Sequence, residues 1–263
     1  MRQKNKHMKA FSLTGVSKSG KTTLVVELTK ELTKRGYSVG TVKSIGCGRG
    51  CQGHLTGACD GTHHHPEFGF TIDTDGKNTF RHRRAGAKVV TAWSKGETAL
   101  IYPERLELAD LIDSYDYDYL IVEGGRAYPL PKITTGSSLE NLDKRLSETT
   151  FAISGKIADQ IDEYKGIKAF KTFDDIEKLA DLVEEKVYPV LAFKDYKGCK
   201  MCGMTCKDLA EKIARGEKTY KDCLRAYPKI DFAGDEETEE KIRKALVKMD
   251  LADFPREIKI SYK

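Results

Sequence analysis

A glycine-rich stretch near the N-terminus constrains the fold of this chain more than any other feature. Residues 15–22 read G-V-S-K-S-G-K-T and match the pattern G-x-x-x-x-G-K-[ST] without a gap. An apolar run at residues 10–13 precedes the stretch, and apolar residues at helical spacing follow it at residues 23–32. In a strand–loop–helix context, backbone N–H groups of the loop and of the helix N-terminus bind phosphate oxygens. The sequence therefore predicts a phosphate-binding loop; the alternative is a glycine-rich turn that matches by chance.

The residues of this loop have expected roles. Lys21 is expected to reach the β- and γ-phosphates of a nucleoside triphosphate, and the Thr22 hydroxyl to ligate Mg²⁺. The second lysine of deviant Walker loops lies five residues before the first, where this chain has Val16, so a MinD-like dimer-sandwich ATPase is disfavoured. No guanine-reading motif is present, and the residues alone leave GTP and ATP open. The other candidates for nucleotide binding are Gly15, Ser17, Lys18, Ser19, Gly20 and Thr23.

The rest of the chain predicts an α/β protein, a P-loop NTPase with a mostly parallel sheet flanked by helices. We expect strands at residues 10–13, 37–43, 68–73, 88–92, 98–102, 119–122, 150–154 and 167–170. We expect helices at residues 23–32, 80–87, 106–112, 176–187 and 238–249. Pro189 is the expected domain boundary. The predicted domains are a nucleotide-binding domain (1–190, with a cysteine- and glycine-rich insertion at 45–62) and a small cysteine-rich metal-binding domain (191–263).

Acidic and basic residues outside the loop complete the predicted nucleotide site. Glu123 follows the most apolar strand, and ligands of parallel α/β sheets bind beyond the carboxyl ends of strands. We therefore expect Glu123 to act with Lys21 in catalysis, by holding Mg²⁺ or orienting water; a strand-end carboxylate without a role is the alternative. A second polar stretch could stabilise charge on the γ-phosphate, although a solvated surface explains each of its members equally well. Its members are Asp73, Lys77, His82 and Arg83.

Composition limits the location and the partners. The formal net charge is +5, with lysines scattered among acids, which suits an anionic ligand and does not indicate nucleic acid. No apolar run approaches the roughly 20 residues that span a bilayer. The basic N-terminus runs directly into the first strand, with no room for the apolar core of a signal peptide. We expect a cytoplasmic protein that binds neither nucleic acid nor membrane.

Seven cysteines fall into two groups, which in a reducing compartment indicate metal sites and not disulfides. The C-terminal group supplies four thiolates, which favour a 4Fe–4S cluster, with Zn²⁺ or free thiols as alternatives. The first group holds three thiolates, and His54 or one of His63, His64 and His65 could complete a metal site with them. Alternatively, two subunits could share a cluster, or the loop could carry thiols that bind no metal. The candidate metal ligands are Cys199, Cys202, Cys206 and Cys223 in the C-terminal group, and Cys47, Cys51 and Cys59 in the first.

The first 190 residues resemble the MobB family, the molybdopterin-guanine dinucleotide biosynthesis adapter proteins. The resemblance lies in residues 15–22, T-V-K at 41–43, H-H-H at 63–65, D-T-D-G-K-N-T-F-R-H-R-R-A-G-A at 73–87, L-I-V-E-G at 120–124 and P-L-P-K-I at 129–133. It implies a dimeric P-loop fold with weak GTPase activity that assists a nucleotidyltransferase joining GTP to molybdopterin. The resemblance also implies GTP and Mg²⁺ as ligands, with molybdopterin guanine dinucleotide as a further candidate ligand and with Asp73, Lys77, His82 and Arg83 near them. The cysteine insertion and the C-terminal segment depart from the family pattern.

Residues 202–216 are in addition similar to the 4Fe–4S domain of the corrinoid iron–sulfur proteins, in which a third cysteine opens a helix. Three hypotheses follow. The first is a slow, GTP-binding MobB-like adapter with an iron–sulfur domain, acting with a molybdopterin guanylyltransferase or a client molybdenum or tungsten enzyme. The second is an NTP-dependent protein that matures metallocentres or delivers metal or electrons. The third is a non-enzymatic redox sensor with nucleotide as its ligand.

Overall fold

The computed structural model describes residues 8–45, 73, 75–104, 106, 108–187, 202–223, 230–233, 235–238, 240–241, 244 and 258–261. The chain divides into two compact units. The first combines Met1–Lys43 with Asp116–Lys263, and the second is Ser44–Tyr115. The second unit is therefore an insertion between two strands of the first.

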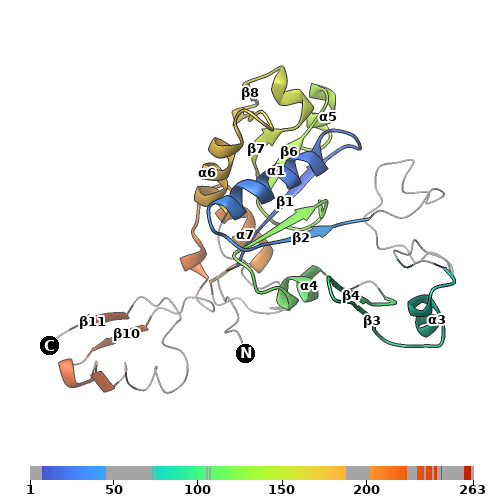
Figure 1. Cartoon of the computed structure of the whole chain (residues 1–263). Coiled ribbons are helices and arrows are strands. Elements are labelled where there is room, and N and C mark those ends of the chain that lie inside the picture. The colour runs from blue at the N-terminus through green and yellow to red at the C-terminus, as the bar shows by residue number, and fades with distance from the viewer. Residues whose placement is uncertain are drawn as a thin grey trace. The chain divides into compact units, whose positions relative to one another are not determined.

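The first unit is built on a five-stranded parallel sheet with the strand order β2-β5-β1-β6-β7 (Figure 1). Its central strand, β1, pairs with β5 on one side and with β6 on the other. Because all five strands are parallel, their carboxyl ends lie at one edge of the sheet. The strands are β1 (Lys9–Gly15), β2 (Val39–Lys43), β5 (Tyr119–Glu123), β6 (Lys132–Thr135) and β7 (Thr150–Ser154).

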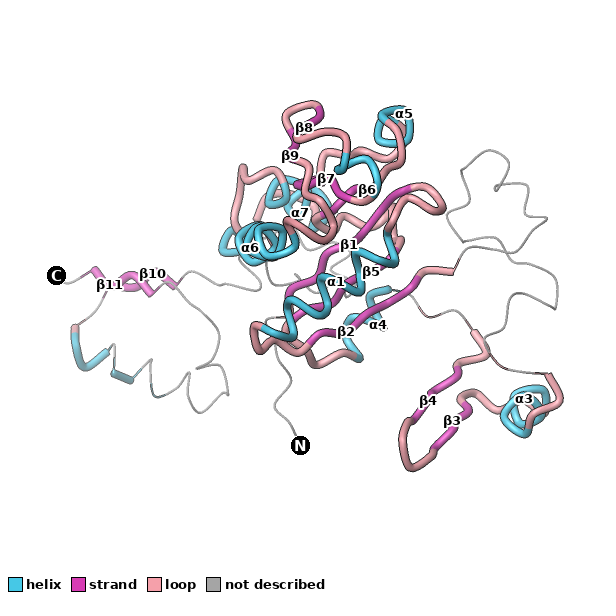
Figure 2. The backbone as a smooth tube through the Cα atoms, turned by 45° about the horizontal axis from the view of Figure 1, so that its top comes forward, coloured by secondary structure: helices cyan, strands magenta, loops and turns pink. Residues whose placement is uncertain are grey.

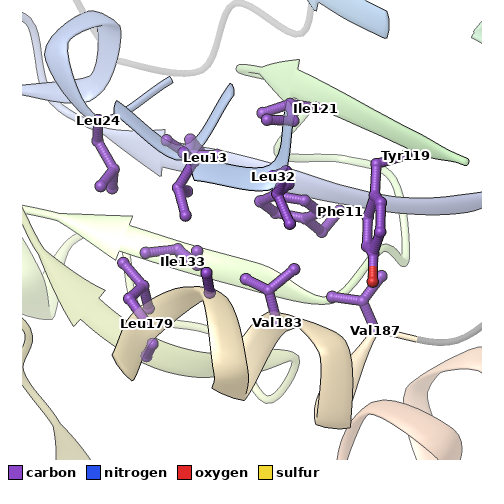
Figure 3. Packing of buried hydrophobic residues seen from close by; sticks show 13 residues of the cluster. Phe11, Leu13, Leu24, Leu32, Tyr119, Ile121, Ile133, Leu179, Val183 and Val187 are labelled. Atoms are coloured by element: carbon purple, nitrogen blue, oxygen red, sulfur yellow. The ribbon is translucent and has the colours of Figure 1, made fainter. Parts of the chain in front are cut away.

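Two helices cover one face of this sheet, and the core lies beneath them. They are α1 (Lys21–Lys34) and α6 (Ile176–Lys186). Both carry apolar residues at helical spacing, and these side chains meet the alternate residues of β1 and β5 that point to the same face. Figure 3 shows the resulting cluster, which includes Phe11, Leu13, Leu24, Leu32, Tyr119, Ile121, Ile133, Leu179, Val183 and Val187.

Shorter elements complete the first unit, and Figure 2 shows how they follow one another along the backbone. Helix α7 starts with a capping box, in which Thr205 and Asp208 each accept a backbone N–H of the other. The short elements are α5 (Leu139–Asp143), η1 (Lys156–Asp159), β8 (Glu163–Tyr164), β9 (Ile167–Lys168), α7 (Cys206–Ala214), η2 (Tyr220–Asp222), β10 (Ile230–Ala233) and β11 (Ile258–Ser261).

The described residues of the second unit form an antiparallel hairpin and two short helices. The hairpin consists of β3 (Val90–Trp93) and β4 (Thr98–Ile101), with Val90 opposite Ile101 and Trp93 opposite Thr98. Helix α3 (Asn78–Arg84) precedes the hairpin and α4 (Leu108–Ser114) follows it.

The α/β fold with a mostly parallel sheet is confirmed, with element ends shifted by a few residues. Strand β6 was not expected. The strand expected at 167–170 is the two-residue β9, which pairs with β8, and Ala169 just beyond it forms a single parallel bridge with Ile153 of β7 at the edge of the main sheet. The boundary at Pro189 and most of the residues expected as a strand at 68–73 and a helix at 238–249 lie outside the described residues. Within the described part of the chain, no helix has the length and apolar character needed to cross a membrane.

Candidate nucleotide site

The predicted phosphate-binding loop connects β1 to α1 at the carboxyl edge of the sheet. Lys18 (φ 62°) and Gly20 (φ 101°) both have left-handed backbone conformations, which turn the chain sharply into the helix. Gly15 (φ 153°) lies so close to β6 that a Cβ atom there would be 2.3 Å from Thr135 Oγ1. The glycines of the motif are therefore required by the turn and by the neighbouring strand.

Contacts from β6 and β7 hold the loop from beneath. Ser19 is fully buried, and its Oγ lies 2.6 Å from Thr135 Oγ1 and donates to the Val16 carbonyl at 2.8 Å. The Lys156 amide donates to the Ser19 carbonyl at 3.2 Å. Gly155 fits under the loop, where a Cβ atom would be 2.2 Å from that carbonyl oxygen. Sequence reasoning missed these supports, because no local pattern links residues 15–20 to residues 135–156.

The side chain of Lys21 lies across its own loop. Its Nζ donates to the carbonyls of Gly15 at 3.1 Å and Val16 at 2.5 Å. Partial burial lowers the pKa of Lys21; Glu123 opposes this shift, while Lys43 and Arg145 add to it. A bound triphosphate offers oxygens that carry charge and so replace these carbonyls favourably. Ser17, Lys18 and Thr23 are exposed around the loop, whereas the Ser19 hydroxyl is used within the protein.

Glu123 lies where the sequence predicted, at the end of β5, and is only 8% exposed. One carboxylate oxygen, Oε1, accepts a hydrogen bond from Thr22 Oγ1 at 3.0 Å. The same oxygen forms an ion pair with Lys43 Nζ at 2.5 Å. Mg²⁺ in nucleotide sites takes one or two protein oxygens and completes its octahedron with phosphate and water oxygens. The adjacent hydroxyl and carboxylate of Thr22 and Glu123 fit that requirement.

Lys43 is a further residue of the candidate site, and sequence reasoning did not assign it a role. It ends β2 directly opposite Glu123 in the parallel register between β2 and β5. In the sequence, Lys43 could be recognised only as a lysine at the end of a predicted strand. Its pairing with Glu123 becomes visible once the order of the strands is known.

The second predicted group lies within the second unit, around α3. Thr79 donates to Asp73 Oδ1 at 2.9 Å, which ties the turn to the helix. Lys77 is the N-cap residue of α3, His82 is exposed, and the Arg83 guanidinium lies 4.9 Å from the centre of the Phe80 ring. The structure thus brings these four residues into one short segment, and their approach to the nucleotide stays a prediction.

The predicted metal ligands are only partly described. Cys47, Cys51, Cys59 and Cys199 lie outside the described residues, and Cys206 is known only as the first residue of α7. Cys202 and Cys223 have half-buried side chains. Among the residues that the structure describes, no group of three or more His, Cys, Asp or Glu side chains could hold a metal ion. The iron–sulfur cluster and its zinc alternative therefore stay predictions.

A strand, a glycine loop with left-handed positions and a helix at the carboxyl edge of a parallel sheet define a P-loop α/β protein. The model of the family described as Molybdopterin guanine dinucleotide synthesis protein B, MobB, matches residues 10–49 and 57–153, slightly more than half of the chain. The chain belongs to this family.

Relatives agree with that assignment. A probable molybdopterin-guanine dinucleotide biosynthesis adapter protein of Bacillus subtilis is 27% identical over 165 residues, which are 62% of this chain and 84% of the relative. The crystal structure of Bacillus subtilis MobB superimposes with a TM-score of 0.52 at 25% identity, covering 68% of this chain and 98% of that one.

A relative from Methanocaldococcus jannaschii, which carries the same adapter designation provisionally, is 23% identical over 222 residues, covering 83% of this chain and 78% of the relative. A match of this length extends past residue 190. The similarity to this archaeal relative therefore includes part of the C-terminal segment.

Proposed function

We propose that this chain is a GTP-binding adapter in molybdopterin-guanine dinucleotide biosynthesis. The observation that carries the proposal is the preformed loop of a MobB family member, with Thr22 and Glu123 side by side at its mouth. In this proposal the loop amides and Lys21 hold the triphosphate, and Thr22 and Glu123 hold Mg²⁺. The base specificity for GTP comes from the family and not from the geometry, so ATP is the competitor to test.

Hydrolysis in this proposal is slow, with Lys21 and Glu123 as its catalytic residues. An adapter uses the bound nucleotide to change shape and so needs little turnover. Its partner is a molybdopterin guanylyltransferase or a client molybdenum or tungsten enzyme. An NTP-dependent metallocentre maturation protein is less favoured, because the family match covers the whole nucleotide site.

Calorimetric titration with GTP and with ATP in the presence of Mg²⁺ tests this function. Lys21→Ala should weaken GTP binding by about 10-fold to 100-fold, because charge-assisted bonds to phosphate are lost. Lys30→Ala is the matched control, since Lys30 lies on the exposed side of α1 and pairs with Glu27. Equal GTP affinity in wild type and Lys21→Ala would contradict the proposal.

We also propose that the chain forms a homodimer. The support lies in the hairpin of the second unit, where the exposed apolar side chains share one face. Trp93 is 86% exposed and Leu100 is 56% exposed, and the register puts both on the face that Val89 and Tyr102 continue. A two-stranded hairpin with an uncovered apolar face gains stability by contact with another surface. Light scattering should give twice the chain mass for wild type and a lower mass for Trp93→Ser; an equal mass for both would exclude this face.

A third proposal concerns the C-terminal cysteines, which we expect to bind a 4Fe–4S cluster. Its support is the sequence spacing together with the start of α7 at Cys206, as in the iron–sulfur domains that the segment resembles. Anaerobic purification with a visible spectrum and iron and sulfide analysis tests it. A colourless, zinc-containing protein would refute it.

A further inference from the structure

Two arginines flank the phosphate-binding loop and have no role in the function proposed above. Arg126 lies three residues beyond Glu123, in the turn that follows β5, and Arg145 lies two residues beyond α5, in the connection that follows β6. Because β5 and β6 are the two neighbours of β1, the two connections leave the sheet on either side of the loop. Helix α5 lies at the same end of the sheet as the loop (Figure 1).

Backbone contacts fix both connections. The Gly124 amide donates to the Leu13 carbonyl at 2.9 Å, and the Tyr128 amide closes a turn on the Gly125 carbonyl at 3.1 Å. The Arg145 amide donates at 2.8 Å to the carbonyl of Leu142, whose side chain is fully buried. Both arginines are thus held on ordered backbone close to the loop.

Neither guanidinium has an acidic partner within the described part of the chain. Arg145 is half-buried, and its Nε–H is buried without any acceptor. Arg35 on α1 shows the usual arrangement instead, with bonds to Glu31, Asp181 and Glu184. A buried donor without an acceptor is costly, and native proteins satisfy nearly all such groups by protein, water or ligand.

The charges near Arg145 have one sign. Burial lowers the pKa of Arg145, and the positive charge of Arg126 lowers it further. Arg145 in turn contributes to lowering the pKa of Lys21. Arg145 therefore feels the positive charge of Arg126 and adds its own to Lys21, and an anion bound beside Arg145 would relieve this repulsion.

We propose that Arg145, supported by Arg126, forms a second phosphoryl-binding subsite next to Lys21. The subsite takes a phosphoryl group beyond the β-phosphate of the nucleotide, and the planar guanidinium suits it because two parallel N–H groups match two phosphate oxygens. The group comes from one of two sources, the γ-phosphate of the nucleotide or a phosphate ester or pyrophosphate of a second ligand. This inference rests on the proposed nucleotide site.

Calorimetry on the full chain with Mg²⁺ separates the two sources. The probes are GDP, a non-hydrolysable GTP analogue, and inorganic pyrophosphate added to the GDP-loaded protein. The variants are Arg145→Met, Arg126→Met and the charge-retaining Arg145→Lys. Lys144→Met is the matched control, since the adjacent Lys144 is exposed and pairs with Glu140. Thermal unfolding checks that each variant is folded.

If the γ-phosphate occupies the subsite, Arg145→Met weakens the binding of the GTP analogue by about 10-fold or more and leaves the affinity for GDP unchanged. If a second ligand occupies it, Arg145→Met leaves both nucleotides unchanged and removes pyrophosphate binding to the GDP-loaded protein. In either case Arg126→Met has a smaller effect, Arg145→Lys is intermediate, and Lys144→Met behaves as wild type. Unchanged binding of all three probes by folded Arg145→Met overturns the subsite alone. Failure of wild type to bind GDP overturns the proposed function and the subsite together.

Discussion

We expect Gly155 to help set the shape of the phosphate-binding loop, although it lies outside the loop sequence. It follows β7, has a φ of 78°, and lies directly beneath Ser19. A Cβ atom there would be 2.2 Å from the Ser19 carbonyl oxygen and 2.9 Å from Thr135 Cβ. Gly166 offers a matched comparison, because its φ is 76° and a Cβ atom there would have no neighbour within 4 Å.

The two glycines separate backbone strain from steric displacement. Alanine in the left-handed region costs about 1–2 kcal/mol at either position. In Gly155→Ala, the Ser19 carbonyl must in addition move back by about 1 Å to reach ordinary contact, which adds about 1–3 kcal/mol of overpacking. That movement also breaks the hydrogen bond from the Lys156 amide and shifts the loop amides. We therefore expect Gly155→Ala to lose about 2–5 kcal/mol of unfolding free energy and Gly166→Ala about 1–2 kcal/mol.

The decisive measurement is nucleotide affinity. In calorimetric titration with GTP and Mg²⁺, Gly155→Ala should bind about 10-fold more weakly than wild type, since its loop amides no longer match the phosphate oxygens. Gly166→Ala should bind GTP as wild type does. Urea unfolding of both variants supplies the stability difference. Equal stability losses in the two variants, together with wild-type GTP affinity in Gly155→Ala, would refute the role of this contact in shaping the loop.

Two further predictions concern charged groups away from the loop. Burial lowers the pKa of Lys132 from 10.5 to about 8, so between these pH values the folded protein binds fewer protons than the unfolded chain. Stability should therefore rise with pH across this window, by at most about 1.4 kcal/mol per pH unit, and Lys132→Met should lack this rise in urea unfolding at several pH values. Arg35, at the end of α1, forms ion pairs with Asp181 and Glu184 on α6. Arg35→Ala should lower the unfolding free energy by about 1–3 kcal/mol, whereas Lys30→Ala, at an exposed pair, should change it little. Equal losses in the two variants would contradict the bridging role of Arg35.

The sequence predicted the elements whose signal is local. These elements are the loop motif, the apolar strands β1 and β5, and the helices α1 and α6. The pattern that reveals each of them is contained in one short stretch of sequence. Two strands at 88–92 and 98–102 and helices at 80–87 and 106–112 were predicted, and the structure has a strand or a helix in each of these places. What the sequence did not indicate was that these residues form a separate unit inserted between β2 and β5.

Strand β6 escaped prediction because its residues are mostly polar. It reads K-I-T-T, yet all four residues are buried, and Lys132 is only 3% exposed. Its polar groups are satisfied by distant partners: Thr134 lies 3.2 Å from Thr14 and 3.1 Å from Thr150, hydroxyl to hydroxyl, and Lys132 Nζ donates to Thr149 Oγ1 at 2.7 Å. Burial of polar residues that depends on neighbouring strands leaves no hydrophobic pattern in the strand itself.

The nucleotide site divides in the same way. Lys21, Thr22 and Glu123 follow from a motif and a strand end, and in the structure the Thr22 hydroxyl donates to Glu123. Lys43 follows only from the register of β2 with β5. Gly155 and Arg145 depend on the return of the chain through β6 and β7, more than a hundred residues after the motif. Sequence patterns therefore pointed to the groups that we propose bind the nucleotide and Mg²⁺, and missed the groups that hold or surround them.

The arrangement of these groups also bears on the slow hydrolysis that we propose for this site. The loop is ordered by its own buried contacts, and Lys21 is satisfied by two loop carbonyls. Nucleotide binding thus exchanges existing bonds for stronger ones and costs little ordering of the backbone. Interactions that hold the bound nucleotide and the transition state equally raise affinity without accelerating the chemical step. Glu123 already binds both Thr22 and Lys43 through one oxygen, so it is better placed to keep Mg²⁺ in position than to abstract a proton from water. Such a site favours retention of the nucleotide, which an adapter needs while it engages its partner.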